Sequence, residues 1–130
     1  MNNIVFTNGC FDILHRGHLE LLKYCKSLGT VIVGLNSDES VKRLKGEARP
    51  VNNQKDRQFM LECCKFVDAV VIFDEDTPYN LIKKFNPDII VKGGDYKVSG
   101  VVGSDLAAVH IFNTINGYST TKIIENLTDR

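Results

Sequence analysis

Two histidines and a set of glycines, lysines and hydroxyl residues have the types and spacing that could handle a phosphorylated ligand. His15 and His18 flank Arg-Gly after a short apolar run, Lys92 precedes Gly-Gly-Asp, and three hydroxyl residues precede Lys122. Positive or cationisable groups where a helix begins are disfavoured by the helix dipole, unless an anion lies between them. Because helix N-termini with free N–H groups bind phosphate, this pattern predicts an anion site.

Two common nucleotide-binding motifs are absent from the sequence. No Gly-x-Gly-x-x-Gly follows the first apolar run, and there is no Gly-Lys-Ser/Thr of a P-loop. The predicted anion is therefore neither an NAD pyrophosphate held in the usual way nor a P-loop nucleotide.

The elements that would position these residues alternate along the chain. Short β-branched runs predict strands at 4–6, 31–33, 69–73, 88–91 and 109–112. Helical periodicity predicts helices at 18–28, 38–44, 54–66, 78–85 and 119–127. This rhythm predicts the α/β class, with a Rossmann-like, doubly wound parallel five-stranded sheet and helices on both faces. Ligands bind such sheets beyond the carboxyl ends of the strands, and the segment 93–105 is expected to be a loop.

Length and composition predict one domain over residues 1–130, without room for a second catalytic domain. Sixteen basic and sixteen acidic side chains balance, which argues against partners such as nucleic acid or an anionic membrane. No apolar run approaches the roughly 20 residues of a membrane span, and no secretory signal is expected. Cys10, Cys25, Cys63 and Cys64 form no Cys-x-x-Cys pair, so we expect reduced thiols in a cytoplasmic protein. Cys63 and Cys64 are expected on a helix, with at least one of them buried.

The motif His15-Arg16-Gly17-His18, together with segments 9–12 and 119–121, resembles the His-x-Gly-His nucleotidyltransferase superfamily, which is cytidylyltransferase-like. Segments 7–12, 35–38, 44–51 and 91–96 resemble the D-glycero-D-manno-heptose 1-phosphate adenylyltransferase (ADP-heptose synthase) family. The resemblance covers nearly the whole chain. The stretch between Gly103 and Ser119 is shorter than the family pattern.

The resemblance implies an enzyme that transfers a nucleoside monophosphate from a nucleoside triphosphate to a sugar phosphate and releases pyrophosphate. ATP and heptose 1-phosphate, giving ADP-heptose, are the substrates it favours. Because two anions must meet, this reaction needs charge neutralisation and in-line geometry more than a base. Mg²⁺ is expected to enter with the nucleotide and to need few protein ligands, and no metal-binding residues are assigned. A homodimer is implied by the resemblance alone.

The site residues follow from the same resemblance. His15, His18 and Lys92 are the expected catalytic groups, because donors aimed at the charge developing on the α-phosphate stabilise the transition state. Contacts with the nucleotide are expected from Thr7, Asn8, Gly9, Phe11, Gly17, His18, Gly93, Asp95, Ser119, Thr120 and Thr121. Contacts with the sugar phosphate are expected from Asp12, Lys23, Asn36, Asp38, Arg49 and Arg57.

Several of these residues also have a purely structural interpretation. Phe11 fits packing, Asp12 fits fixing a turn, Lys23 fits a solvated lysine, and Asp38 and the segment 119–121 fit helix capping.

Three other functions stay open at this point. One is a glycerol-3-phosphate-type cytidylyltransferase that uses CTP, and another is a non-catalytic nucleotide-binding protein of the same fold. The third is a thiol redox switch through Cys63 and Cys64.

Overall fold

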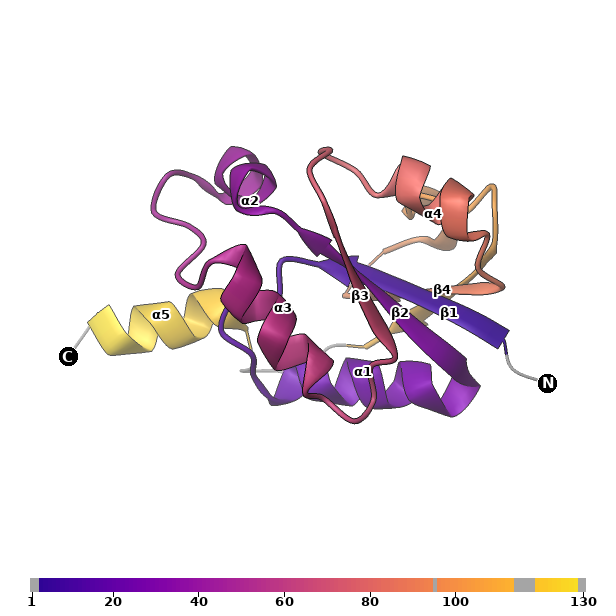
Figure 1. The fold of residues 1–130 in the computed structure, drawn as a ribbon, viewed down its shortest axis with the longest axis horizontal. Helices are drawn as coiled ribbons and strands as arrows, with labels where there is room; N and C mark the ends of the chain where they lie inside the picture. Colours follow the sequence, from indigo (N-terminus) through magenta and orange to yellow (C-terminus); the bar gives the residue numbers. More distant parts are fainter. Residues whose placement is uncertain (1–2, 95, 114–118, 129–130) are drawn as a thin grey trace.

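The computed structural model describes residues 3–94, 96–113 and 119–128. Its core is one five-stranded sheet in the order β3-β2-β1-β4-β5, in which every pairing is parallel (Figure 1). The strands are β1 (Asn3–Gly9), β2 (Gly29–Asn36), β3 (Ala69–Phe73), β4 (Ile89–Gly93) and β5 (Ala108–Phe112). The predicted fold class is confirmed.

Five α-helices and one short 3₁₀ helix connect and follow the strands in the described residues. They are α1 (Arg16–Leu28), α2 (Asp38–Lys45), α3 (Gln54–Glu62), α4 (Tyr79–Phe85), α5 (Thr120–Thr128) and the 3₁₀ helix η1 (Val98–Gly100). The segment 93–105, expected to be a loop, thus contains one turn of helix. No helix in the described ranges is both long and apolar enough to cross a membrane.

The sheet is covered on both faces, as predicted. On one face, Leu22 and Cys25 of α1 and Leu61 of α3 pack in one cluster with Val5 of β1. On the other, Ile82 of α4 packs in a second cluster with the next residue of β1, Phe6. Successive side chains of a strand point to opposite faces, so a strand buried on both sides is a continuous apolar run.

The predicted helix over 54–66 is too long at its carboxyl end. Helix α3 ends at Glu62, and a turn follows in which the Cys64 N–H donates to the carbonyl of Leu61. This turn lets Phe66 pack against the first core cluster before β3 begins. Cys63 is consequently exposed and Cys64 half-buried, so the expectation that at least one of them is a buried helix residue is wrong.

A crevice opens between β1 and β4, where the chain order of the sheet reverses. The register of β1 with β4 ends at Phe6 opposite Ile90, whereas β1 stays paired with β2 as far as Gly9. The Thr7 hydroxyl donates to the carbonyl of Val91 at 2.9 Å and adds one last link. Such a switch point is the usual ligand site of open α/β sheets. In Figure 1, α5 lies at the end of the molecule toward which β1 and β2 run.

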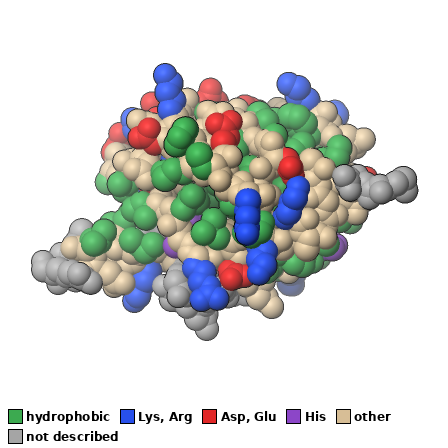
Figure 2. Space-filling view, turned by 60° about the horizontal axis from the view of Figure 1, so that its bottom comes forward, with side chains coloured by type: hydrophobic (Ala, Val, Ile, Leu, Met, Phe, Trp, Pro, Cys, Tyr) green, Lys and Arg blue, Asp and Glu red, His purple; other side chains and the backbone are tan. Residues whose placement is uncertain are grey.

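Charged side chains of both signs share the surface. On the face drawn in Figure 2, Lys and Arg side chains are interspersed with Asp and Glu. This agrees with the balance of sixteen basic and sixteen acidic residues.

Candidate active site

A cavity of about 620 Å³ lies at the carboxyl ends of the strands and gathers residues from several separate segments of the chain. Its lining includes the predicted residues Asn8, Gly9, Phe11, Asp12, His15, His18, Asn36, Arg49, Lys92, Ser119 and Thr121. An adjoining cavity of about 320 Å³ shares His18 and Lys92 and is also lined by Thr7, Gly17, Gly93 and Phe112. The structure therefore brings most of the predicted residues together.

The two histidines build the start of α1. His15 is the N-cap, and its Nδ1 accepts a hydrogen bond from the Gly17 N–H at 3.0 Å. In return the His15 N–H donates to Nδ1 of His18 at 3.3 Å, which completes a capping box. Helix α1 therefore begins at Arg16, two residues before the predicted start, because histidines fill capping positions that Ser, Thr, Asp or Asn usually occupy.

These contacts fix the tautomer of both rings. An Nδ1 that accepts a hydrogen bond carries no proton, so the neutral ring carries its proton on Nε2. Burial, together with the neighbouring His15, lowers the pKa of His18 to about 4. Burial also lowers the pKa of His15, and the ring centroids lie 3.8 Å apart in a stack. At neutral pH the pair therefore offers Nε2–H groups as hydrogen-bond donors.

The remaining basic residues of the helix starts lie away from the cavity. Arg16 is exposed and pairs with Glu20, four residues along α1. Lys122, in the first turn of α5, is exposed and lines neither of the two cavities. Positive charge in the main cavity comes instead from Lys45, Arg49 and Lys92.

The loop between β1 and α1 is strained beneath the histidines. Phe11 and Ile13 have φ values of 47° and 52°, a region that bulky and β-branched residues rarely adopt. The buried Phe11 ring lies 5.2 Å from the His18 ring, centroid to centroid. A Cβ at Gly9 would stand 3.2 Å from the Phe11 ring, so glycine gives this ring its room. Phe11 thus supports His18, as the packing interpretation predicts, and it also borders the cavity.

Lys92 leaves the end of β4 between the two cavities and lines both. Its Nζ lies 5.0 Å from the centroid of the Tyr96 ring, at cation–π distance. Tyr96 is half exposed and lines the main cavity. The lysine is thereby directed at the crevice.

Asp12 organises the loop that carries Arg49. Asp12 is 1% exposed, and its carboxylate accepts from the N–H groups of Val51 and Asn52 at 2.7 and 2.9 Å. The Nε of Arg49 donates to the same carboxylate at 3.3 Å. The turn-fixing interpretation of Asp12 fits these bonds, and the loop includes a cis peptide bond between Arg49 and Pro50.

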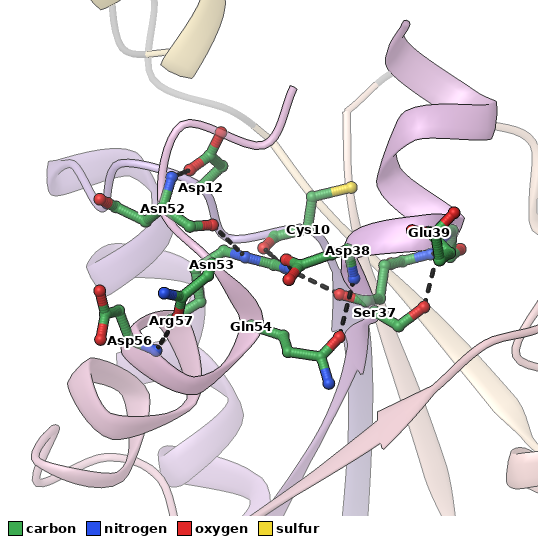
Figure 3. A network of polar contacts seen from close by, with 12 residues as sticks. Cys10, Asp12, Ser37, Asp38, Glu39, Asn52, Asn53, Gln54, Asp56 and Arg57 are labelled. Carbon is green, nitrogen blue, oxygen red and sulfur yellow. Dashed lines mark hydrogen bonds and ion pairs between the residues drawn. The ribbon is translucent and has the colours of Figure 1, made fainter. Parts of the chain in front are cut away.

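Arg57 is placed differently from the prediction. Its side chain is 0% exposed, and its guanidinium donates to the carbonyls of Asn52, Cys10 and Asn36 and to the carboxylate of Asp38 (Figure 3). The prediction that Arg57 contacts a substrate is wrong, because all of these donated bonds go to protein oxygens and no surface remains for a ligand.

Three further residues predicted to bind the sugar phosphate lie in different surroundings. Asn36 lines the main cavity, and its side-chain amide donates to the Ser40 hydroxyl at 2.9 Å. Asp38 lines neither of the two cavities, and Ser37 rather than Asp38 is the N-cap of α2, which corrects the capping interpretation. Lys23 is exposed on α1 and also lies outside the lining of both cavities, which fits a solvated lysine.

The start of α5 completes the cavity. The Ser119 hydroxyl accepts from the Lys122 N–H at 3.0 Å, so it caps the helix as the structural interpretation predicts. Ser119 and Thr121 nevertheless also line the main cavity. Asp95 and the side chain of Thr120 lie outside the described residues.

Several lining residues were not assigned a role from the sequence. They are Cys10, Leu44, Lys45, Asp76, Thr77, Pro78, Tyr96 and Val102. Lys45 and Tyr96 lie inside segments that carry the family resemblance, so their place near the site can be predicted from those segments. Thr77 and Pro78 precede α4, and only the three-dimensional fold brings that loop to the cavity.

Comparison with known proteins gives the family. The model of the cytidylyltransferase-like family matches residues 6–126. The chain belongs to this family. The resemblance drawn from the His15–His18 motif is thus confirmed, together with the nucleotidyltransferase class of enzyme that it implies.

Curated relatives are much longer than this chain. It is 60% identical over 126 residues to "Bifunctional protein HldE" of a Nitratiruptor species, covering 95% of this chain and 27% of that protein. It is 59% identical over 128 residues to the protein of the same name from Campylobacter concisus, covering 97% and 27%. The chain therefore spans about a quarter of the length of these relatives.

Solved structures share the fold. The lipopolysaccharide core biosynthesis protein from Thermoplasma volcanium has a TM-score of 0.73 at 26% identity, covering 92% of this chain and all of that one. Pantoate-beta-alanine ligase from Francisella tularensis has a TM-score of 0.68 at 17% identity, covering 96% of this chain and 65% of that one. The second likeness concerns the fold alone.

Proposed function

We propose that this chain transfers the adenylyl group of ATP to heptose 1-phosphate, forming ADP-heptose and pyrophosphate. The observation that carries the proposal is the stacked pair His15 and His18, held as neutral Nε2–H donors on the wall of a cavity that Lys92 also lines. The resemblance to the heptose 1-phosphate adenylyltransferase family and the relatives named HldE support the choice of substrates.

In this reaction a phosphate oxygen of the sugar phosphate attacks the α-phosphorus of ATP. A new phosphorus–oxygen bond forms, the bond from the α-phosphorus to the oxygen that bridges to the β-phosphate breaks, and pyrophosphate leaves with that electron pair. The attacking oxygen is already anionic, so it needs positioning and charge neutralisation rather than a strong base.

Each part of the cavity has a role in the proposal. The Nε2–H groups of His15 and His18 donate to the α-phosphate as negative charge develops, and Lys92 adds positive charge. The start of α5, with Ser119 and Thr121, receives the β- and γ-phosphates. Arg49, which lines the main cavity alone, receives the acceptor phosphate, and Lys45, which lines both cavities, adds positive charge. The smaller cavity between β1, β4 and α1 receives the nucleoside.

Mg²⁺ would neutralise the phosphates of the bound nucleotide. Among the described residues, no group of three or more His, Cys, Asp or Glu side chains could hold a metal ion. The cavity carboxylates of Asp12 and Asp76 are bonded to Arg49 and Arg43. This donor set fits an ion held mainly by phosphate oxygens, with few protein ligands.

Pyrophosphate release tests the proposal. Purified protein is incubated with Mg²⁺ and either ATP or CTP, and with heptose 1-phosphate of each anomer or glycerol 3-phosphate. We expect turnover with ATP and one heptose 1-phosphate anomer. Turnover with CTP and glycerol 3-phosphate alone would replace the proposal by the cytidylyltransferase alternative, and nucleotide binding without turnover would favour a non-catalytic protein.

The homodimer and the cytoplasmic location stay predictions from the sequence. Sedimentation velocity at micromolar concentration and fractionation of cells test them.

A further inference from the structure

Two buried charged side chains, those of Asp12 and Arg57, form hydrogen bonds with the backbone of segment 49–52. Asp12 accepts from the N–H groups of Val51 and Asn52, and the Nε of Arg57 donates to the carbonyl of Asn52 at 2.9 Å. Asp12 thus binds two N–H groups of the segment, and Arg57 binds one of its carbonyl groups. Asp12 is 1% exposed and Arg57 0%.

Arg57 also joins this segment to the ends of two strands. Its Nη1 donates to the carbonyls of Cys10, after β1, and Asn36, the last residue of β2, at 2.8 and 2.7 Å. Its Nη2 donates to the carboxylate of Asp38 at 2.8 Å, and Figure 3 shows Cys10 and Asp38 beside the guanidinium of Arg57. A buried charge costs free energy that well-packed apolar residues would avoid. We therefore interpret this arginine as a residue that fixes the positions of the segments whose oxygens it binds.

The residue whose position these bonds determine is Arg49. Its side chain is 14% exposed, its Nε donates to Asp12, and it lines the main cavity. Arg49 does not line the smaller cavity, whereas His18 and Lys92 line both. Arg49 thus faces the part of the site that is away from the proposed nucleoside pocket. A planar guanidinium held at Nε is suited to bind a phosphate with its remaining donors.

We propose that Asp12 and Arg57 are positioning residues that hold segment 49–52 so that Arg49 binds the phosphate of the acceptor sugar. This inference rests on the proposed function, since it assigns Arg49 to the acceptor of that reaction. In this inference Asp12 and Arg57 do not contact the substrate, and they affect binding of the sugar phosphate only through Arg49.

A double-mutant cycle measures this dependence. Asp12→Asn keeps the size of the side chain but loses the charge and one of the acceptors. We expect it to raise the KM for the sugar phosphate at least about 10-fold, the scale of one lost hydrogen bond to a charged group, and the KM for ATP less than about 3-fold. Arg49→Gln is expected to raise the same KM similarly. Adding Asp12→Asn to Arg49→Gln should then change the KM for the sugar phosphate by less than about 2-fold, since the effects of substitutions at coupled residues do not add.

Asp68→Asn is the matched control. Asp68 likewise accepts a backbone N–H, that of Val31, and pairs with a basic side chain, that of Lys26, but it lies at the opposite edge of the sheet and lines neither cavity. We expect both KM values to stay at those of the wild type.

Arg57→Lys is the second variant, used if Asp12→Asn shows no cooperative thermal unfolding. The ammonium keeps the charge but cannot reach the four oxygens that the guanidinium spans, so the KM for the sugar phosphate should rise, and rise much less once Arg49 is Gln. Additive effects, or no change of that KM in Arg49→Gln, would overturn the inference. Equal changes in both KM values together with a lower Tm would show a merely structural role and also overturn it. A wild-type protein that releases no pyrophosphate would instead refute the proposed function itself.

Discussion

Aspartates accept backbone N–H groups at both ends of the parallel strands, but in different surroundings. We call the side at which the strands begin the amino edge of the sheet, and the side at which they end the carboxyl edge. At the amino edge, Asp88 and Asp68 accept the N–H groups of Ile4 and Val31 at 2.8 Å each, and both aspartates are exposed. At the carboxyl edge, Asp12 accepts two backbone N–H groups while it is almost fully buried. The exposed aspartates join strands to neighbouring segments, whereas the buried one holds a loop that lines the cavity. Burial, more than residue type, separates a structural contact from one that shapes the site.

Backbone strain is also greater at the carboxyl edge than at the amino edge. Asn86, which ends α4 before β4 begins, has a φ of 48°, and asparagine tolerates this conformation. Phe11 and Ile13 adopt similar values at the carboxyl edge, where neither residue type favours them. Strain that surrounding structure must hold in place is concentrated beneath the histidines.

The largest expected effect is that of His18→Asn at the carboxyl edge. The Asn side-chain oxygen can take the place of Nδ1 and keep the bond from the His15 N–H, while the Nε2–H is lost. We expect kcat to fall at least about 100-fold, the scale of removing one oxyanion donor, with ATP affinity reduced far less. Steady-state kinetics and calorimetry measure the two. Equal losses in kcat and ATP affinity would mean that His18 only binds ATP, and would contradict a catalytic role for the carboxyl edge.

Gly29→Ala should affect stability rather than catalysis, because it lies at the amino edge. A Cβ there would overlap the carbonyl oxygen of Asn3, a backbone atom that cannot move aside. We expect a loss of roughly 3 kcal/mol in the free energy of unfolding, as for severe overpacking, and an unchanged kcat per folded molecule. Urea unfolding and an active-site titration measure these. A fall in kcat without loss of stability would contradict the separation of the two edges.

Acid should destabilise the protein through the histidine pair. The pKa of His18 in the folded state, about 4, lies below its ordinary value of 6.5, so between these pH values the unfolded chain binds the extra proton. Stability is therefore fully present above pH 6.5 and falls as the pH drops toward 4, by up to roughly 3 kcal/mol. Urea unfolding from pH 7 to pH 4 measures the slope, which should become smaller in His18→Asn. An equal slope in both proteins would mean that other groups cause it.

The smallest effect is expected from Asp68→Asn. Hydrogen bonds from Lys26 first, and then from the Val31 N–H, lower the pKa of Asp68 below its ordinary value of 3.8. Its contribution to stability is present above that value and is lost as the pH falls through the lower pKa of the folded state. Because Asp68 is exposed, solvent screening keeps this contribution small. Acid titration followed by circular dichroism should show nearly the same midpoint in the variant, and a large shift would make the amino edge as sensitive as the carboxyl edge.

The sequence predicts the sheet and the location of the site because both depend on local patterns. Strand 69–73 is predicted residue for residue, since it is one continuous apolar run that is rich in β-branched residues. The role of Arg57 could not be predicted, because its partner Cys10 lies 47 positions away in the chain and only folding buries the guanidinium. The start of α1 was missed for a different reason, because histidine is an unusual capping residue.

The central claim is that the carboxyl edge holds a nucleoside triphosphate against two neutral imidazoles. NMR of ¹⁵N-histidine-labelled protein at pH 7, before and after addition of Mg²⁺ and ATP, tests it most directly. We expect His15 and His18 both to be neutral with the proton on Nε2, and both sets of ring resonances to shift when ATP is added. Cationic rings, protons on Nδ1, or resonances that ATP leaves unchanged would contradict the claim.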